Sequence, residues 1–387
     1  FDHPEEAAAL GDRARRAAEL HRGATDRAVD RADRLYHRAI PCPRPSLPAR
    51  CLLWLPARGW ETAARLRDWA YRQDWLSTER LQTCTVSIGN LTAGGTGKTP
   101  LVLWLIEQLQ SRQVRCAVLT RGYRRRRGEQ VTILRPGDPA PADLTGDEVQ
   151  ILLRHFRLPV GISADRHTAG CEVEQRFQPE VILLDDGFQH RPLERDFEVV
   201  LLDVSDPFGR REFLPLGRLR EPLEALGRAD AFVLTRVHAA ERWEGLREEL
   251  CRYNPQAPVF TARLEPTAVV DAATGESRPV DWLTGRRVLA FCGVGNPAAF
   301  RDTVAQTGAR IVEAISFPDH HRYRDGERRR LRQAAERASA ELLLTTEKDL
   351  VNLGGSSLGP LPLYWLETRM VLERGDQLLE LILSSDR

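Results

Sequence analysis

The sequence predicts an α/β protein with a doubly wound parallel sheet, a second, smaller α/β domain and an amphipathic helix near the N-terminus. From residue 83 onward, short apolar runs alternate with helical stretches, and most runs lack polar–apolar alternation. Such runs are typical of parallel strands buried on both faces. With 42% hydrophobic residues among 387, the chain can form a substantial core. We expect strands at residues 83–89, 114–120, 159–163, 180–185, 197–203, 230–235, 288–293, 311–316 and 341–346.

Composition excludes several classes of protein. The chain carries 56 Lys and Arg against 55 Asp and Glu, a formal net charge of +1, so we expect no nucleic-acid partner. The seven cysteines form no CxxC pair, which favours reduced thiols over a disulfide framework or a zinc site. No apolar run approaches the roughly 18 residues of a membrane span, and we expect a protein on the cytoplasmic side.

The chain divides into segments of different character. Residues 1–38 are rich in Ala, Arg and Glu and indicate a charged helical tail, and the first residue is Phe1 rather than Met, which suggests a piece of a longer polypeptide. Prolines then predict a linker, followed by the amphipathic helix, within residues 39–80. Beyond it we expect domains at 81–205 and 206–350, with a C-terminal strand and helix at 351–387.

The amphipathic helix has an aromatic face and a basic face. The aromatic face contains Ala57, Trp60, Ala64, Tyr71 and Trp75, and the opposite face Arg58, Arg65 and Arg72. Trp prefers the membrane interface, and arginines engage anionic headgroups. The pattern therefore predicts contact with an anionic membrane surface, and packing against the protein's own core is the alternative.

A Gly-rich loop joins the first expected strand to a helix. In SIGNLTAGGTGKTP, Gly97, Lys98 and Thr99 match G-x-x-x-x-G-K-[ST], whereas Thr92 stands at the first glycine position. Backbone N–H groups of such a loop bind phosphates, the lysine reaches the β- and γ-phosphates and the hydroxyl ligates Mg²⁺. An ordinary turn that closes a βα unit is the alternative. The candidate phosphate-binding residues are Gly94, Gly95, Thr96, Gly97, Lys98 and Thr99.

Lysine is nearly absent from the chain. Only two of the 56 basic residues are lysines, Lys98 in GGTGKT and Lys348 in TTEKD. A lysine retained against such an arginine bias suggests a position that requires a compact ammonium group.

Two motifs contain adjacent carboxylates. VILLDDGFQH places Asp185 and Asp186 at the end of an apolar strand, where an aspartate of an α/β sheet can hold a metal shell. TGDEVQ places Asp147 and Glu148 at the start of a helix. Helix capping explains the second pair equally well, and a turn or cap is the alternative for the first.

FPDHHRY and TRGYRRRRGE contain further candidates. A histidine oriented by a carboxylate is a candidate general base, and here Asp319, His320 and His321 are adjacent. An ordinary loop or a metal site is the alternative, although no second His/Cys cluster supports a metal. The arginines of 121–127 are either a solvated charge run or contacts to an anionic substrate.

Taken in order, these motifs resemble those of the tetraacyldisaccharide 4'-kinase family, the lipid A 4'-kinases of Gram-negative bacteria. The matching stretches are SIGNLTAGGTGKTP, TRGY, GDE, SADRHTAG, DDGFQH, LPLGRLREP, FPDHHRY and TTEKD. The resemblance implies ATP- and Mg²⁺-dependent phosphorylation of the 4'-hydroxyl of tetraacyldisaccharide 1-phosphate, a lipid disaccharide, to give lipid IVA. It also implies two α/β domains with the active site between them and peripheral attachment to the cytoplasmic face of the bacterial inner membrane.

The resemblance also assigns roles to residues. Asp147 and His320 would form the dyad that takes the hydroxyl proton. The magnesium shell would include Thr99, Glu148 and Asp186. Asp185, Asp186 and Asp319 would support the metal and the dyad. Departures from the family pattern, such as Val149 after GDE and Arg218 in LPLGRLREP, remove no proposed catalytic group.

Residues 1–38 resemble the C-terminal tail of a Kdo transferase, the next enzyme of the same pathway, which suggests fusion or association with one; an ordinary charged helix is the alternative.

Two other functions remain open. TTEKD is similar to a guanine-specificity loop of a P-loop GTPase or metallochaperone, although Lys348 is followed directly by Asp349. The third possibility is a non-catalytic membrane-binding scaffold.

Overall fold

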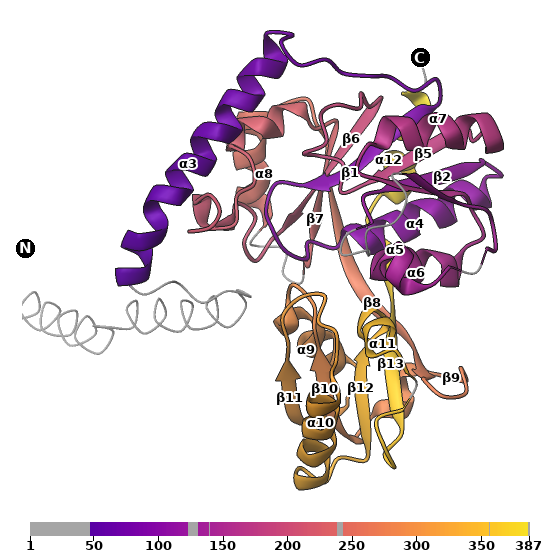
Figure 1. Cartoon of the computed structure of the whole chain (residues 1–387). Coiled ribbons are helices and arrows are strands. Elements are labelled where there is room, and N and C mark those ends of the chain that lie inside the picture. The colour runs from indigo at the N-terminus through magenta and orange to yellow at the C-terminus, as the bar shows by residue number, and fades with distance from the viewer. Residues whose placement is uncertain (1–46, 123–130, 139, 238–242, 356, 386–387) are drawn as a thin grey trace, which may run out of the picture. The chain divides into compact units, whose positions relative to one another are not determined.

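The computed structural model describes residues 47–385 except 123–130, 139, 238–242 and 356 (Figure 1). The predicted tail at 1–38, with its resemblance to a Kdo transferase, lies outside the described residues, as do Arg124 to Arg127 of the arginine run.

The first half of the sheet is built from apolar runs that the sequence predicts as parallel strands. In space the order is β7, β6, β1, β5, β2, β4, β3. All neighbours pair in parallel except β3, which is antiparallel to β4 at the edge. The bounds are β1 (Cys84–Asn90), β2 (Cys116–Thr120), β3 (Val131–Leu134), β4 (Val160–Ser163), β5 (Val181–Asp185), β6 (Phe197–Asp203) and β7 (Ala231–Thr235).

Because β1 lies between β5 and β6, the order of the strands reverses there. A crevice forms at such a point beyond the carboxyl ends of the strands, where the Gly-rich loop follows β1. Helices in this half are α4 (Lys98–Ser111), α5 (Ala142–Thr145), α6 (Asp147–His155), α7 (Arg166–Phe177) and α8 (Trp243–Tyr253), with 3-10 turns η1 (Gly209–Arg211) and η2 (Leu223–Arg228).

The second half repeats the α/β pattern on a smaller scale. Strand β10 pairs in parallel with β11 and β12, and β12 with β13. The strands are β8 (Val259–Asp271), β9 (Ser277–Arg278), β10 (Arg287–Cys292), β11 (Arg310–Ser316), β12 (Leu342–Thr346) and β13 (Leu363–Leu372). The helices are α9 (Pro297–Gln306), α10 (Asp325–Arg337) and α11 (Glu347–Leu353), with the 3-10 turn η4 (Val280–Leu283).

Strands β8 and β13 join the two halves into one hydrogen-bonded sheet. They pair antiparallel from Ala262 opposite Leu372 to Asp271 opposite Tyr364, while β8 also pairs in parallel with β7. Figure 1 shows β8 running from the first half into the second. The domain bounds given above remain predictions, and the sheet continues across residues 205 and 206 because β6 pairs with β7.

The core lies on both faces of the sheet. In β6, Val199 and Leu201 face one cluster with α4, whereas Val200 and Leu202 face another with α8. Helix α12 (Gly375–Ser384) follows β13 and returns to the first of these clusters through Leu378, Leu379 and Ile382. The C-terminal segment therefore belongs to the core of the first half of the sheet.

The amphipathic helix is α3 (Leu47–Arg72), and the predicted aromatic face lies partly against the protein and partly in solvent, since Trp60 and Trp75 are 47% and 71% exposed. Ala57 and Ala64 are buried, the Trp60 indole N–H donates to the carbonyl of Arg220 at 3.1 Å, and the Arg191 guanidinium lies over the Tyr71 ring. The small alanines allow this part of the face to pack against the protein, as in the alternative interpretation, while the predicted membrane contact stays a prediction.

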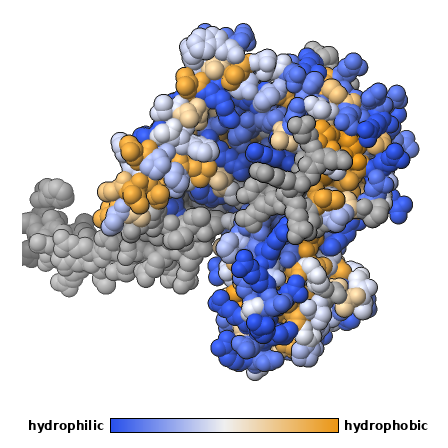
Figure 2. All heavy atoms as spheres, viewed as in Figure 1, coloured by the Kyte–Doolittle hydropathy of each residue, from blue (hydrophilic) through white to orange (hydrophobic). Residues whose placement is uncertain are grey.

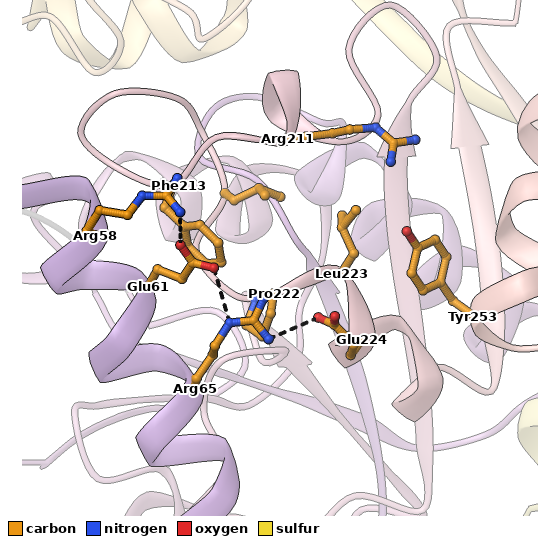
Figure 3. A pocket seen from close by; sticks show the side chains of 10 residues that line it. Arg58, Glu61, Arg65, Arg211, Phe213, Pro222, Leu223, Glu224 and Tyr253 are labelled. Carbon is orange, nitrogen blue, oxygen red and sulfur yellow. Dashed lines mark hydrogen bonds and ion pairs between the residues drawn. The ribbon is translucent and has the colours of Figure 1, made fainter. Parts of the chain in front are cut away.

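The arginines of the predicted basic face form ion pairs near the helix. Arg58 and Arg65 pair with Glu61, and Arg72 pairs with Asp68. Figure 3 shows Arg58, Glu61 and Arg65 beside a pocket that is also lined by Glu224 and Tyr253. The charges of α3 are thus largely neutralised by neighbouring carboxylates.

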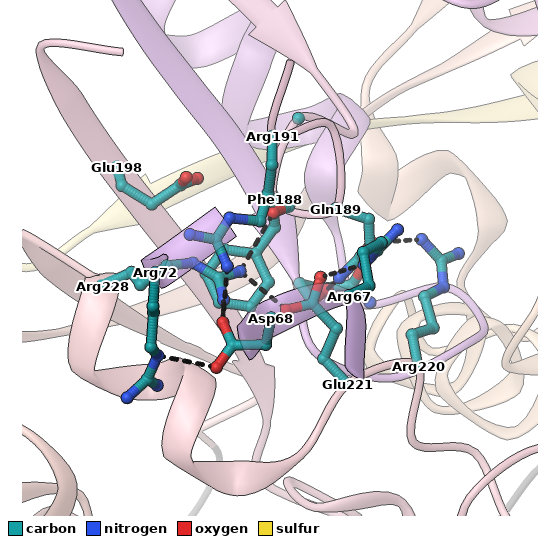
Figure 4. A network of polar contacts seen from close by, with 12 residues as sticks. Arg67, Asp68, Arg72, Phe188, Gln189, Arg191, Glu198, Arg220, Glu221 and Arg228 are labelled. Carbon is teal, nitrogen blue, oxygen red and sulfur yellow. Dashed lines mark hydrogen bonds and ion pairs between the residues drawn. The ribbon is translucent and has the colours of Figure 1, made fainter. Parts of the chain in front are cut away.

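A second polar network attaches α3 to the loop after β5 (Figure 4). Asp68 accepts from Arg191, and Arg67 donates to Glu221, which also accepts from Arg228. Since Arg191 immediately follows the DDGFQH motif, α3 is connected to a loop that carries candidate catalytic residues.

Candidate active site

The Gly-rich loop is held from outside by side chains that bind its carbonyl oxygens. Arg218 Nε donates to Ala93 at 2.7 Å, Arg236 Nη2 to Gly95 at 2.7 Å and Thr235 Oγ1 to Thr96 at 2.9 Å. Gly94 and Gly97 have φ angles of 113° and 93°, which L side chains rarely adopt. Helix α4 begins directly after Gly97 without a side-chain cap, which is typical of a helix N-terminus that binds an anion.

The loop after β10 brings the second half of the sheet against the Gly-rich loop. A Cβ atom on Gly295 would lie 2.3 Å from the backbone nitrogen of Gly95, so a side chain at Gly295 would force the loops apart. This close approach connects the candidate phosphate site to the half that carries FPDHHRY and TTEKD.

Lys98 lies between two polar partners of the first half. Its Nζ donates to Asn90 Oδ1 at 3.1 Å and lies 3.4 Å from Asp186 Oδ1. Arg220 Nη1 donates to both oxygens of Asp186, at 3.0 and 3.1 Å. Burial would raise the pKa of Asp186, but the charges of Lys98 and Arg220 outweigh it and lower this pKa to about 2. Asp186 is therefore a charged partner of the phosphate-loop lysine.

Asp185 is in the opposite electrostatic situation. Its side chain is buried at the end of β5, and burial, followed by the negative charges of Glu148 and Asp186, raises its pKa to about 8. Three carboxylates thus influence one another at the carboxyl end of the sheet. A concentration of carboxylate oxygens of this kind suits a divalent cation.

Asp147 and His320 meet although they are 173 residues apart. His320 Nδ1 lies 2.7 Å from Asp147 Oδ2, which also accepts from Asn352 Nδ2 at 3.0 Å. Burial would raise the pKa of Asp147, but the His320 hydrogen bond and the Lys348 charge outweigh it and lower the pKa. The N-cap of α6 is Gly146, which has no side-chain cap, so the tertiary contact accounts for Asp147 better than capping does.

Lys348 occupies the other side of the His320 ring. Its Nζ lies 3.2 Å from His320 Nε2, donates to Asp319 Oδ1 at 3.2 Å and is 4.0 Å from Asp147 Oδ2. Burial would lower the pKa of Lys348, but the charges of Asp319, Glu148 and Asp147 outweigh it and raise the pKa. Both lysines of the chain therefore lie in candidate-site clusters.

Asp349, the neighbour of Lys348, ties together the loops around this cluster. Its fully buried carboxylate accepts from the backbone N–H of Gly293 at 2.8 Å and from the Tyr323 hydroxyl at 2.7 Å. The N–H of His320 in turn donates to the Gly293 carbonyl at 3.1 Å. One buried side chain thus supports the loop facing Gly95, the FPDHHRY loop and α11.

Asp349→Ala is therefore expected to lower the free energy of unfolding by about 2–4 kcal/mol, because two buried donors lose their acceptor. Tyr323→Phe, which removes one donor and keeps the carboxylate, should cost only about 1 kcal/mol. Urea unfolding followed by circular dichroism measures both changes. Equal losses in the two variants would contradict the bridging role of Asp349.

Comparison with known proteins identifies the family. The family model described as Tetraacyldisaccharide-1-P 4'-kinase matches residues 49–385, nearly all of the described chain. The chain belongs to this family. The match favours the kinase over the GTPase and scaffold interpretations of the sequence.

Curated relatives of the kinase match over most of their length. The tetraacyldisaccharide 4'-kinase of Halothermothrix orenii is 36% identical over 301 residues, which cover 74% of this chain and 78% of the relative. That of Syntrophotalea carbinolica is 36% identical over 365 residues, covering 91% and 99%. The crystal structure of LpxK from Aquifex aeolicus, described as an "apo" form in complex with ATP, has a TM-score of 0.68 and 31% identity, covering 88% of this chain and 100% of that one.

The fold of the kinase brings the motif residues into two neighbouring clusters. Lys98 and Asp186 form one, and Asp147, Asp319 and His320 form the other. Glu148 connects them electrostatically, since it affects the pKa of both Asp185 and Lys348. By contrast, His321 stacks on Phe317 and lies 3.0 Å from Glu327, so it supports its own loop.

Four residues that contact the candidate site residues were not among those predicted: Asn90, Arg220, Lys348 and Asn352. The scarcity of lysine singled out Lys348 without indicating what it contacts. Asn352 lies four residues beyond Lys348 in α11, so the two share a helix face. Nothing in the sequence distinguishes Asn90 from other strand-end residues.

Proposed function

We propose that the chain transfers the γ-phosphoryl group of ATP to the 4'-hydroxyl of tetraacyldisaccharide 1-phosphate, giving lipid IVA in lipid A biosynthesis. The observation that carries this proposal is the Asp147–His320 pair beside a phosphate-binding loop. A phosphate loop by itself supports nucleotide binding, whereas a carboxylate–imidazole pair also supplies a proton acceptor for an alcohol.

The roles of the chain's residues follow from the two clusters. Gly94 to Thr99 bind the phosphates of ATP, and Lys98 stabilises negative charge on the transferred phosphoryl group. The Asp147–His320 pair holds the acceptor hydroxyl and takes its proton. Asp185 and Asp319 support these groups. The charges of Glu148 and Asp186 raise the pKa of Asp185, and Asp319 accepts from Lys348 and from the backbone N–H of His320.

Thr99, Glu148 and Asp186 are the donors we propose for Mg²⁺. Hydroxyl and carboxylate oxygens suit this ion, which phosphoryl-transfer enzymes usually hold with one or two carboxylates plus substrate phosphates. Within the described residues, no three His, Cys, Asp or Glu side chains form a closed metal-binding group. When bound, the ion neutralises charge on the β- and γ-phosphates.

A transfer assay with the full chain tests the proposed function. Terminally labelled ATP or GTP is supplied with tetraacyldisaccharide 1-phosphate in mixed micelles, and the phosphorylated position of the lipid is determined by NMR. We expect ATP-dependent phosphorylation at the 4'-oxygen. Nucleotide hydrolysis without lipid phosphorylation, or a preference for GTP, would contradict the proposal.

For membrane attachment, we propose the outward face of α3, which lies opposite the buried Ala57 and Ala64. Leu52, Leu55 and Leu66 are 78%, 71% and 60% exposed, and they share one side of the helix with Gly59 and Trp69. Figure 2 shows hydrophobic surface along this helix. No helix in the described ranges is long and apolar enough to cross a membrane. The proposed substrate is an amphiphile, so peripheral binding at the cytoplasmic face of the inner membrane brings the site to it.

Leu66→Glu is expected to lower partitioning onto phosphatidylglycerol-containing vesicles by about tenfold or more, because one exposed leucine no longer enters the interface. Co-sedimentation measures the change. Leu381→Glu is the matched control, since Leu381 is also an exposed helix leucine but lies on α12. If both variants bind vesicles equally well, the outward face of α3 has no role in attachment.

A further inference from the structure

We propose that Arg218 and Arg236 are positioning residues of the nucleotide site, whose guanidinium groups hold two peptide units of the Gly-rich loop with their N–H groups turned toward the phosphates. This role rests on the proposed function and adds to it two residues that the sequence patterns did not connect with the nucleotide.

The carbonyl oxygens of the Gly-rich loop are occupied, whereas its N–H groups are open. Four side chains donate to the carbonyl oxygens of residues 92, 93, 95 and 96, in this order: Asn90, Arg218, Arg236 and Thr235. Within the described residues, the backbone N–H groups of 94–97 donate to no protein acceptor. Open N–H groups in consecutive residues are the arrangement that binds an anion.

Planarity of the peptide bond connects these two observations. In a trans peptide unit the C=O and N–H bonds point in opposite directions, so a donor that fixes the oxygen also fixes the N–H group. By holding the preceding carbonyl oxygen at 2.7 Å, Arg218 directs the N–H of Gly94 and Arg236 directs that of Thr96. A peptide unit that turned over would present its oxygen to a phosphate, which would repel it.

Each guanidinium group is itself held by a buried carboxylate. Arg218 Nη1 donates to Asp206 Oδ2 at 3.2 Å, and the two side chains are 8% and 3% exposed. Arg236 forms an ion pair with Asp203, which also accepts from the backbone N–H and the hydroxyl of Ser205. A buried ion pair contributes little net stability, because the loss of hydration offsets the attraction. What the two guanidinium groups hold therefore explains these pairs better than stability does.

The ends of the neighbouring strands direct these side chains at the loop. Strands β6 and β7 follow β1 in the sheet, so their carboxyl ends lie beside the loop that leaves β1. Arg236 comes directly after Thr235, the end of β7, and its φ angle of 63° is uncommon for arginine. Consecutive side chains of an extended strand point to opposite faces, and this turn allows both to reach the loop. Arg218 packs so closely that a Cβ atom on Gly94 would lie 2.5 Å from its Nη2.

Loss of either guanidinium group has a defined kinetic signature. The peptide unit that it held becomes free to turn over, and only the fraction of molecules with the N–H group inward binds the phosphates. The apparent Kd is the intrinsic Kd divided by that fraction. Saturating ATP restores the binding orientation, so the loss appears in the KM for ATP and not in kcat. Damage to the fold instead lowers the fraction of active enzyme and therefore kcat.

Calorimetric titration of the full chain with tripolyphosphate and with ATP measures binding without the reaction. Arg236→Met should raise both dissociation constants by about tenfold, the effect of one lost charge-assisted contact. Because this variant leaves the buried Asp203 without its partner, Asp203→Asn/Arg236→Met removes both charges and should show the same tenfold loss in a chain that unfolds like the wild type. Asp206→Asn/Arg218→Met tests the second pair in the same way.

Steady-state kinetics provide the second readout. The double variants should raise the KM for ATP by about tenfold, with kcat within about threefold and the KM for the lipid within about twofold of wild type. Arg287→Met is the matched control, since Arg287 Nη2 also donates to a carbonyl oxygen, that of Ala338 at 2.6 Å, but lies at the start of β10. It should bind tripolyphosphate like the wild type. Wild-type dissociation constants in the folded double variants, or a fall in kcat with an unchanged KM for ATP, would overturn the proposal.

The two proposals fail in distinguishable ways. If the wild-type chain binds ATP but phosphorylates no lipid, the proposed function fails, while the titrations with tripolyphosphate still test the positioning role. If the wild type phosphorylates the lipid and the double variants bind tripolyphosphate equally well, the positioning role fails and the proposed function stands.

Discussion

Lys98→Ala should abolish lipid phosphorylation, lowering kcat by about 10³-fold or more, because the transferred phosphoryl group loses its nearest cation in the transition state. In the structure the ammonium is held between Asn90 and Asp186 at the first turn of α4. Initial-rate measurements at saturating ATP and lipid determine kcat. Arg112→Ala, at the far end of α4, removes an exposed cation from the same helix and should retain wild-type activity.

Lys98→Arg should also be poor, which distinguishes a requirement for shape from a requirement for charge. A planar guanidinium does not fit between the Asn90 amide oxygen at 3.1 Å and the Asp186 carboxylate at 3.4 Å as a single ammonium does. Near-normal turnover of Lys98→Arg would contradict the argument that lysine persists where a compact ammonium is needed.

Asp147→Ala and His320→Ala should each lower kcat by about 10²–10⁴-fold, the usual range for removal of a general base. Because the two side chains are in contact at 2.7 Å, they should act as a unit, and the double variant should be little worse than either single one. Rate measurements on the three variants form a double-mutant cycle. Fully multiplicative losses would show that the residues act independently.

The control for this cycle lies on the same helix. His155, at the end of α6, lies 2.9 Å from a carboxylate oxygen of Glu347, so it also forms a histidine–carboxylate pair. The Glu347 hydrogen bond raises the pKa of His155 in spite of burial. His155→Ala should leave kcat within about twofold of wild type if only the dyad handles the proton.

Local sequence was sufficient to predict the parallel strands and the phosphate loop. A strand such as β5, Val181–Asp185, is buried along its whole length, and that burial requires the continuous apolar run that predicts it. The loop at Gly97 and Lys98 is equally local, because its function depends on backbone N–H groups and a helix start only a few residues apart. The motif order likewise indicated the family to which the chain belongs.

Strand β8 was not predicted because its pattern depends on its partners. It contains Arg263, Glu265 and Pro266, and its middle residues are only partly buried where it pairs with β13. Antiparallel pairing with a strand about a hundred residues away provides the burial that its composition does not indicate. Strand β3 was missed for a related reason, since it is a short, partly exposed edge strand.

The sequence by itself determined which residue types are available at each loop, and the tertiary structure decided what they do. A helical wheel shows two faces of α3 but not which one meets Arg191 and the carbonyl of Arg220. Likewise, Asp147 at a helix start is indistinguishable from a cap until the fold brings His320 to it. Capping, amphipathicity and strand burial are short-range patterns, whereas a hydrogen bond across 173 residues exists only once the sheet and its crossover helices have placed both loops.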